Sequence, residues 1–290
     1  MTEQITIIGV GLIGGSFALA LKQDGADVRF VGYGRNEDNL IRAVERGIVD
    51  TYSTNLADAV RGSDLVLVAA PVGANALLFE QLASVVSPDC IITDAGSVKQ
   101  SVIKAARQYL GSLKNFVPAH PIAGTEHSGV EAGFASLYQG KRLILTPIPE
   151  TSKEAQAKVI SLWEMTGALV ETMAPERHDK VFAATSHLPH LLAFTLVETL
   201  FRMEQKEELL RYASGGFSDF TRIASSDPVM WKDICLHNSD SILDAISSLE
   251  HGLSALTAAI EQGDELAIEH MFRVAKQTRD EKILSKVNVE

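Results

Sequence analysis

The sequence has little cysteine and no excess of basic residues. Only two of its 290 residues are cysteines, Cys90 and Cys235, and neither lies in a CxxC or Cys/His spacing. We therefore expect no disulfide framework, no metal site, and a reducing compartment such as the cytoplasm. The formal net charge of −11 opposes binding to nucleic acid or to an anionic membrane, because the protein's own field repels both. We expect neither partner.

The sequence also lacks an apolar run suited to a membrane. The stretch from Ile5 to Leu21 carries no charge, but an acidic residue, Glu3, precedes it, and four glycines interrupt it: Gly9, Gly11, Gly14 and Gly15. An export signal begins with basic residues, and a membrane span needs about twenty apolar residues. The stretch instead predicts a buried strand followed by a helix.

Short apolar strands alternate with helices over the first part of the chain. Strands are predicted at 5–10, 28–33, 65–70, 91–94, 116–119, 143–146 and 169–172, with helices that include 39–46, 74–86, 98–110 and 153–165. This alternation is typical of an α/β fold with a doubly wound parallel sheet. We predict such a domain over residues 1–175.

The sequence after Pro175 predicts helices only, and we assign residues 176–290 to an all-α domain. The segment from Phe182 to Met203 is apolar nearly all round and is expected to be buried on most sides. Apolar stripes of this kind favour a homodimer over packing within one chain. A second stripe, with spacings of four and three, comprises Ile242, Ile246, Leu249, Leu253, Leu256 and Ile260.

Residues 9–14 read GVGLIG, a GxGxxG motif between a predicted strand and a predicted helix. Gly9 permits a tight turn, Gly11 lets the backbone approach a pyrophosphate, and Gly14 lets helix and strand pack closely. The phosphates would lie at the positive end of the helix. We therefore predict a Rossmann-type dinucleotide site. Its further residues are Leu12, Ile13, Ala70 and Pro71.

The end of the second predicted strand bears on the choice between NAD and NADP. An acidic residue that binds the ribose 2′-hydroxyl of NAD is expected there. Gly34 and Arg35 occupy the position, and no carboxylate appears before Glu37. A missing acid beside an arginine favours the 2′-phosphate of NADP, whereas Asn36 or backbone groups can still bind NAD.

Polar residues follow two successive strands, in the segments TDAGSVK and HPIAGTE. The carboxyl ends of parallel strands border the ligand crevice of such a sheet. His120, fixed before a proline, is well placed to take a proton from an alcohol during hydride transfer. Ser97 is an ordinary helix cap, a catalytic partner, or both.

A third polar cluster, SHLPH, lies in the helical domain. We prefer a role for it in lining the substrate cleft over a metal site, which lacks a third ligand, and over a buried, satisfied histidine pair. Arg222 follows in an otherwise apolar segment. Its guanidinium suits a substrate carboxylate, or else a structural ion pair with Asp219 or Asp233.

Five motifs in order make the sequence closely similar to the prephenate dehydrogenase (cyclohexadienyl dehydrogenase) family of tyrosine biosynthesis: GVGLIGGS, TDAGSVK, HPIAGTEHSG, SHLPH and GFSDFTRIASSDPVMW. The resemblance implies a dimeric, NAD(P)-dependent enzyme that converts prephenate to 4-hydroxyphenylpyruvate with loss of carbon dioxide; some members act on arogenate. It implies that His120 accepts the proton of the C4 hydroxyl and that Ser97 orients the pair. The implied substrate residues are Arg222, His190, Ser186, His187, Glu126, Asp219 and Trp231.

Two other functions stay open on the sequence. A β-hydroxyacid dehydrogenase would use a lysine early in the second domain, for which Lys180 is the candidate, and would leave His120 without a task. A dinucleotide-sensing protein without catalysis is disfavoured by the set of Ser97, His120 and Arg222.

Overall fold

The computed structural model describes residues 3–125, 127–204 and 206–284, and the chain forms two compact units, Met1–Ser239 and Asp240–Glu290. Glu126, expected in the substrate site, lies outside the described residues. The described residues of the first unit form nine strands: β1 (Glu3–Ile8), β2 (Val28–Tyr33), β3 (Thr51–Ser53), β4 (Leu65–Val68), β5 (Ile91–Asp94), β6 (Phe116–Val117), β7 (Ala119–Pro121), β8 (Arg142–Leu145) and β9 (Leu169–Thr172).

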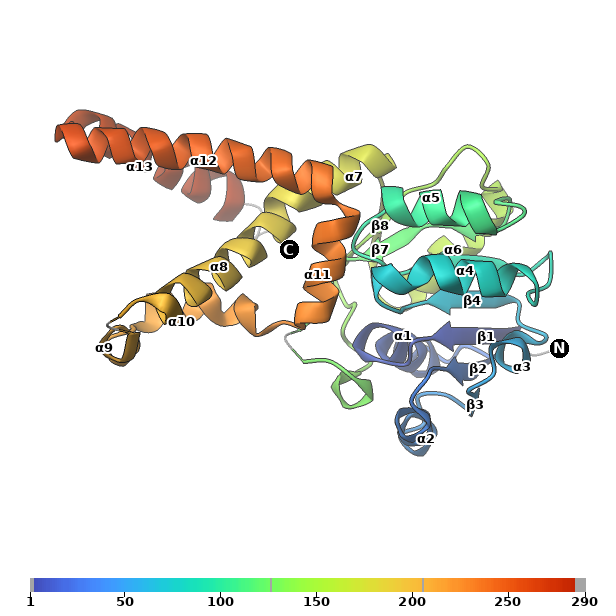
Figure 1. Ribbon diagram of the computed structural model, residues 1–290. Coiled ribbons are helices and arrows are strands. Elements are labelled where there is room, and N and C mark those ends of the chain that lie inside the picture. Colours follow the sequence, from blue (N-terminus) through green and yellow to red (C-terminus); the bar gives the residue numbers. More distant parts are fainter. Residues whose placement is uncertain (1–2, 126, 205, 285–290) are drawn as a thin grey trace. The chain divides into compact units, whose positions relative to one another are not determined.

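Six strands form a parallel sheet in the order β3-β2-β1-β4-β5-β6. Figure 1 labels the first four of them. The order reverses between β1 and β4, so right-handed connections place helices on both faces, as a doubly wound sheet requires. The sequence missed β3 because this strand has three residues, all partly exposed, and so carries no apolar run.

The last three strands form a separate sheet, β7-β8-β9, in which β7 and β8 are antiparallel. The strands predicted at 143–146 and 169–172 are present as β8 and β9, whereas the single strand predicted at 116–119 was wrong, because β6 and β7 share that stretch. Pro118 divides the predicted strand, because proline has no N–H to donate to a neighbouring strand. His120 consequently pairs with Ile144 of β8 in the smaller sheet.

The helices around the sheets are α1 (Leu12–Gln23), α2 (Glu37–Glu45), α3 (Leu56–Val60), α4 (Asn75–Ala83), α5 (Gln100–Tyr109) and α6 (Lys153–Met165), with short turns η1 (Val72–Ala74) and η2 (Val130–Ala132). Trp163 of α6 is fully buried. The centroid of its ring lies 4.7 Å from that of Phe17 in α1 and 5.0 Å from that of Tyr138. The Tyr138 hydroxyl donates to the carbonyl of Ile13. The segment after η2 is therefore anchored to the first turn of α1.

Among the described residues after Thr172, the chain is helical, as expected. The elements of the first unit are α7 (Pro175–Phe182), the π-helical turn η3 (Ala183–His187), α8 (Leu188–Arg202), α9 (Lys206–Arg211), α10 (Gly215–Thr221), η4 (Arg222–Ser225) and α11 (Pro228–His237). The π turn precedes Pro189, whose missing N–H disturbs regular helix bonding. Among the described residues of α8, Ala193 alone is buried, and Phe201 is 62% exposed. Our expectation that this segment is buried on most sides was therefore wrong for the single chain.

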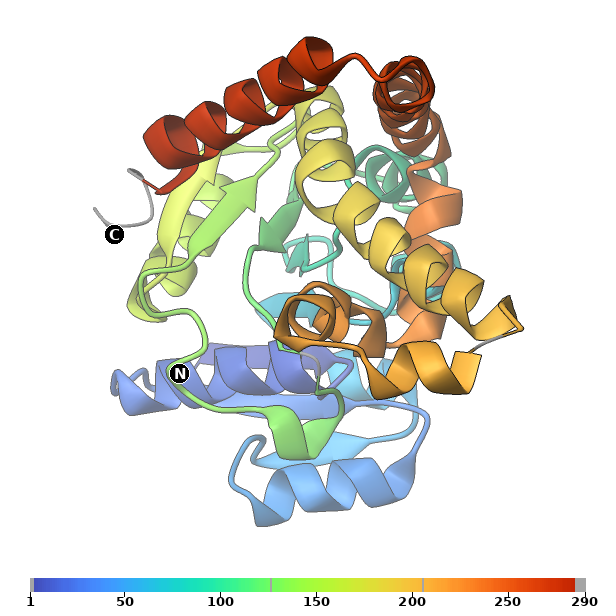
Figure 2. The same ribbon diagram turned by 90° about the vertical axis from the view of Figure 1, so that its left-hand side faces the viewer.

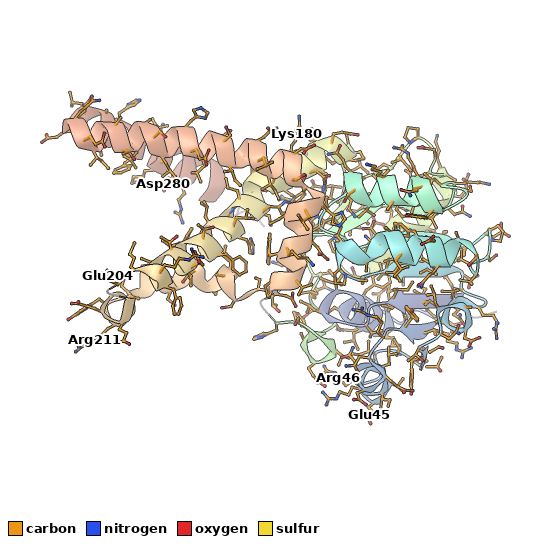
Figure 3. All side chains as sticks on the ribbon, viewed as in Figure 1. Glu45, Arg46, Lys180, Glu204, Arg211 and Asp280 are labelled. Atoms are coloured by element: carbon orange, nitrogen blue, oxygen red, sulfur yellow. The ribbon has the colours of Figure 1, made fainter. Side chains whose placement is uncertain are left out.

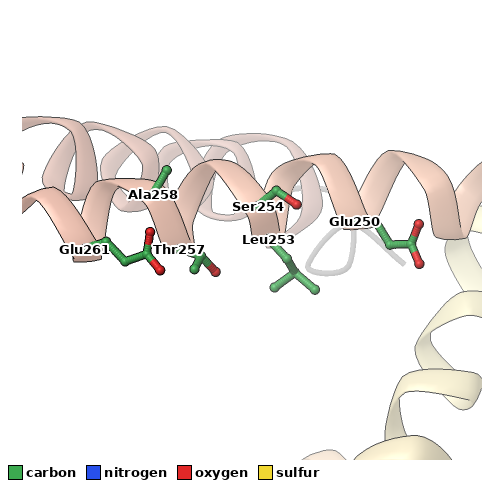
Figure 4. A pocket seen from close by; sticks show the side chains of 6 residues that line it. All are labelled: Glu250, Leu253, Ser254, Thr257, Ala258 and Glu261. Atoms are coloured by element: carbon green, nitrogen blue, oxygen red, sulfur yellow. The ribbon is translucent and has the colours of Figure 1, made fainter.

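The second unit consists of α12 (Ser239–Gln262, which begins on the last residue of the first unit), α13 (Glu265–Thr278) and the turn η5 (Arg279–Leu284). Figure 2 shows α12 and α13 diverging from the turn that joins them. Two of the six residues of the predicted stripe are exposed, Leu253 by 52% and Ile260 by 61%, whereas Ile242 is buried and the other three are partly exposed. The pocket drawn in Figure 4 is lined by residues of α12 alone, Glu250, Leu253, Ser254, Thr257, Ala258 and Glu261. The described part of this unit thus presents apolar side chains without an enclosed core.

Candidate active site

The glycine motif forms a tight turn between β1 and α1. Gly9 has φ +93°, and a Cβ there would lie 2.7 Å from the carbonyl oxygen of Ala69. A Cβ on Gly14 would lie 2.5 Å from the carbonyl oxygen of Gly9, whereas one on Gly11 would meet nothing within 4 Å. Gly11 also begins α1 without a side-chain cap. Gly9 and Gly14 therefore allow close packing, and the open space at Gly11 fits a pyrophosphate against the helix N-terminus.

The remaining predicted cofactor residues surround this turn. Leu12 and Ile13 form the start of α1, and Leu12 is buried. Ala70 is half-buried after β4, beside the backbone that Gly9 approaches, and Pro71 is exposed at the start of η1. The structure brings these predicted residues together at the carboxyl ends of β1 and β4.

The end of β2 carries no carboxylate that could bind a ribose hydroxyl without rearrangement. Gly34 and the exposed Arg35 follow the strand, and the Asn36 side chain caps α2. The Glu37 carboxylate accepts a hydrogen bond from the Tyr52 hydroxyl at 3.2 Å. Arg35 is thus the charged side chain next to the predicted ribose position.

A fully buried ion pair lies at the carboxyl end of β5. The ammonium of Lys99 donates to Oδ2 of Asp94 and to the carbonyl oxygen of Ala119. Asp94 also accepts the amides of Gly96 at 2.8 Å and Ala119 at 3.2 Å. Burial lowers the pKa of Lys99, and the Asp94 carboxylate opposes this shift. The pair fixes the residue that precedes His120 on β7.

His120 begins a chain of hydrogen bonds that ends at α5. Its Nδ1 lies 2.8 Å from Nε2 of His178 on α7, and Nδ1 of His178 lies 2.8 Å from Oδ1 of Asp179. The Asp179 oxygens accept the backbone amides of Lys99 at 2.8 Å and Gln100 at 2.9 Å, at the start of α5. The histidine of the α/β domain is therefore held by the first helix after the last strand.

The surroundings keep His120 neutral. Burial lowers its pKa well below the ordinary value, and the neighbouring His178, Lys99 and His187 act in the same direction. The ring of Phe182 packs against it edge-on, with centroids 4.9 Å apart. A neutral imidazole can accept a proton, which is what a general base requires.

Ser97 lies in the turn between β5 and α5 and is half-buried. It is not the cap of α5, because this helix begins at Gln100 and the Asp179 carboxylate binds its first amides. Nδ1 of His120 is bonded to His178, and within the described residues the Ser97 hydroxyl has no hydrogen-bond partner. The hydroxyl is therefore available to a ligand.

The SHLPH cluster spans η3 and the start of α8. His190 donates from Nδ1 to the carbonyl of Ser186 at 2.8 Å, and its ring stacks on Trp231 with centroids 3.9 Å apart. His187 is buried, with Nδ1 3.2 Å from Nδ2 of Asn238. Burial lowers the pKa of His187 to about 4. Nε2 of His187 and Nε1 of Trp231 are buried without a hydrogen-bond partner in the part of the chain that the structure describes.

Arg222 stands where α10 meets η4, and η4 packs against α8. Burial lowers the pKa of His190, and the positive charge of Arg222 lowers this pKa further. Arg222 is therefore close enough to His190 for its charge to act on the imidazole. Asp219 is exposed on α10. Asp233, the other expected partner of Arg222, instead accepts the amide of Gly73 at 3.2 Å.

Several residues that hold the site together were not predicted from the sequence: Asp94, Lys99, His178, Asp179 and Asn238. The available signal was the adjacent histidine and aspartate at the start of the first helix after β9, where only Lys180 was considered. Lys180 is exposed on α7 (Figure 3), whereas the two residues before it are fully buried. The lysine that a β-hydroxyacid dehydrogenase would need therefore lies at the surface.

Within residues 3–125, 127–204 and 206–284, no three histidine, cysteine or acidic side chains converge as metal ligands. Both cysteines are free thiols. None of the helices in these ranges is long and apolar enough to cross a membrane.

Two family models match the sequence in succession. The prephenate dehydrogenase nucleotide-binding domain matches residues 17–172, and the prephenate dehydrogenase dimerization domain matches residues 174–276. Prephenate dehydrogenase of Bacillus subtilis is 38% identical over 282 residues, which cover 97% of this chain and 76% of that protein. Cyclohexadienyl dehydrogenase of Zymomonas mobilis is 40% identical over 281 residues, which cover 96% of this chain and 95% of that protein.

Solved structures show the same similarity. Prephenate dehydrogenase from Aquifex aeolicus, in complex with hydroxyphenyl propionate and NAD+, has a TM-score of 0.89 and 40% identity, covering 97% of this chain and 98% of that chain. Arogenate dehydrogenase from Synechocystis has a TM-score of 0.80 and 25% identity, covering 97% of this chain and all (100%) of that chain. The chain therefore belongs to the prephenate dehydrogenase family.

Proposed function

We propose that this chain converts prephenate to 4-hydroxyphenylpyruvate and carbon dioxide, with hydride transfer to a nicotinamide dinucleotide, as a step of tyrosine biosynthesis. One observation carries the proposal: a neutral histidine, His120, is held by His178 in the same compact unit as the open glycine turn. The names of the relatives, which include prephenate, cyclohexadienyl and arogenate dehydrogenases, support the substrate class.

The proposed chemistry needs one base at the C4 hydroxyl. When bound, the nicotinamide accepts the hydride of C4. The electron pair of the bond to the departing carboxylate stays in the ring, which becomes aromatic as carbon dioxide leaves. His120 takes the hydroxyl proton in the transition state and returns it to the phenol, so no proton is consumed overall. Ser97, with a free hydroxyl, is proposed to hydrogen-bond the same oxygen.

The substrate's carboxylates need cationic and N–H groups. We assign this task to Arg222 and to the unpartnered Nε2 of His187, with His190 and Trp231 as a stacked wall beside them. Ser186, Asp219 and Glu126 complete the proposed site on the family resemblance. Arogenate has an amino group in place of the keto group of prephenate. We propose prephenate as the main substrate and arogenate as a second one.

Turnover with different substrates tests the proposal. Purified protein is given prephenate, arogenate or small β-hydroxyacids with NAD+ or NADP+, and reduced cofactor is followed by absorbance. We expect turnover with prephenate, and a loss of at least about a hundredfold in kcat for His120→Asn with cofactor binding unchanged. Turnover of hydroxyacids alone, or cofactor binding without any turnover, contradicts the proposal.

We propose NADP as the preferred cofactor, with NAD also used. The support is the exposed Arg35 after β2 and the engaged carboxylate of Glu37. Arg35→Ala is expected to raise the KM for NADP+ about tenfold and to leave that for NAD+ unchanged. Arg42→Ala, on the exposed face of α2, is the matched control. Equal effects of Arg35→Ala on both cofactors would remove the basis for the preference.

We further propose a homodimer with a nucleotide-binding domain over residues 1–175 and a helical domain over 176–290. The support is the dimerization-domain match and the exposed apolar side chains of the helical part, among them Phe201, Leu253 and Ile260. Sedimentation velocity of the wild type and of Leu253→Glu tests it, with a dimer expected for the former and weakened association for the latter. The two free thiols fit a cytoplasmic location.

A further inference from the structure

The Asp179 carboxylate determines which ring nitrogen of His178 carries the proton. It accepts hydrogen bonds from two backbone amides and contacts Nδ1 of His178. An ionised carboxylate can only accept, so each of these partners must be the donor. Burial alone would raise its pKa, but the bonds from His178 and from the amides of Lys99 and Gln100 bring the pKa below the ordinary value. Asp179 is therefore an ionised acceptor, and His178 must carry its proton on Nδ1.

The proton on His178 determines the proton on His120. Burial lowers the pKa of His178, and the Lys99 ammonium also disfavours a second proton, although Asp179 opposes these effects. A neutral His178 protonated on Nδ1 has an unprotonated Nε2, which can only accept. Nδ1 of His120, 2.8 Å away, must then donate. Nε2 of His120 is left without a proton.

Asn238 determines the proton on His187 in the opposite way. One hydrogen of its Nδ2 is donated to the backbone carbonyl of Asp179 at 2.9 Å, and a carbonyl can only accept. This bond identifies the amide nitrogen, so the contact of Nδ2 with Nδ1 of His187 at 3.2 Å is a donation to His187. His187 therefore carries its proton on Nε2, the atom that is buried without a partner among the described residues.

We infer that Asp179 and Asn238 set the tautomers of two active-site histidines in opposite senses, so that His120 offers an unprotonated Nε2 and His187 offers an Nε2–H. His178, Asp179 and Asn238 are positioning residues in this arrangement. The use of the two nitrogens rests on the proposed function: the acceptor takes the proton of the C4 hydroxyl, and the donor binds an anionic oxygen of the substrate. The positions of the protons do not depend on that function.

Nitrogen NMR of the wild-type protein tests the proton positions directly. The protein is labelled with 15N-histidine, and the His120 and His187 rings are assigned from the signals lost in His120→Asn and His187→Asn. Correlations from ring carbon protons to both nitrogens distinguish the two tautomers. We expect Nδ1–H for His120 and Nε2–H for His187. Either ring in the other tautomer at neutral pH overturns the inference, whether or not the protein turns over prephenate.

Replacing the Asn238 amide by a carboxylate tests the role of this residue. In Asn238→Asp the side chain can no longer donate, so His187 is expected to switch to Nδ1–H while His120 keeps its tautomer. The KM for prephenate should rise about tenfold, because the substrate loses a buried donor. Asn115→Asp is the control, since Asn115 donates to a backbone carbonyl, that of Pro88, at 3.0 Å on the exposed side of the protein. An unchanged His187 tautomer in Asn238→Asp contradicts the inference.

Paired variants test the role of His178. His178→Gln retains an oxygen that can accept from Nδ1 of His120, and His178→Leu does not. We expect His178→Leu to lower kcat about a hundredfold with little change in KM, and His178→Gln to recover at least a tenth of the wild-type kcat. A purely structural role would instead give equal losses in the two variants, together with lowered thermal stability. That result would overturn the assignment of His178.

Discussion

Replacing Lys99 by methionine tests whether the buried ion pair below His120 supports the fold. Lys99 and Asp94 are both fully buried, and the Lys99 ammonium donates to the Asp94 carboxylate and to the carbonyl of Ala119. Methionine fills a similar volume but has no charge. The variant thus leaves the Asp94 carboxylate buried without its counterion and the Ala119 carbonyl without its donor.

The expected cost follows from that unpaired charge. Removing one partner of a buried pair typically destabilises a protein by about 3–5 kcal/mol. Asp94 still accepts the amides of Gly96 and Ala119, so we expect a loss near the lower end, about 3 kcal/mol. The turnover number should also fall, because Ala119 precedes His120.

Urea denaturation at fixed protein concentration, followed by circular dichroism, measures these differences. The matched control is Lys22→Met, which breaks an ion pair with Asp50 at 2.7 Å whose side chains are 26% and 43% exposed. Exposed pairs contribute at most about 1 kcal/mol. If Lys99→Met costs no more than Lys22→Met, the buried pair does not support the fold as argued.

Three further outcomes are expected. Gly11→Ala should fold normally but weaken cofactor binding at least about tenfold in calorimetry, because its Cβ enters the space assigned to the pyrophosphate; unchanged affinity would contradict that assignment. Gly14→Ala should lose about 1–3 kcal/mol of stability, because its Cβ would lie 2.5 Å from the Gly9 carbonyl oxygen; an unchanged denaturation midpoint would show that the turn relaxes. The pKa of His187 falls from 6.5 to about 4 on folding, so the unfolded chain binds more protons between these values and the free energy of unfolding should drop by about 3 kcal/mol as pH falls from 6.5 to 4. Denaturation of His187→Gln over the same pH range should show a drop smaller by that amount, and an equal drop would contradict the buried, neutral state of His187.

The sequence predicted the strands of the main sheet well, because each is an uninterrupted apolar run bounded by turn residues. It failed at β3, which has no such run, and at Pro118, where one predicted strand becomes two. That division has a functional consequence, since it moves His120 from the main sheet into the smaller one, where it pairs with Ile144. A single residue without an N–H decided this, and the hydrophobic pattern alone does not reveal it.

The sequence predicted those site residues whose type and local spacing already indicate a function. The glycine motif has a spacing set by the turn and the helix that follow it, and His120 is a proton acceptor wherever a strand ends beside a cofactor. The positioning residues have no such local signal. Asp179 reads as an ordinary acidic residue of a helix, and its importance arises because α7 places it against the first amides of α5.

The sequence by itself determined the doubly wound sheet, the nucleotide turn and the motifs of the family, since these depend on periodicity and on residues close together in the chain. Only the tertiary structure decided which partners each histidine has. His120 and His178 are 58 positions apart, and His187 and Asn238 are 51 apart. Hydrogen bonds across such separations form only when packed helices and strands bring the groups within about 3 Å. The proton positions that we infer follow from the acceptor Asp179 and the donor Asn238 at the ends of these bonds.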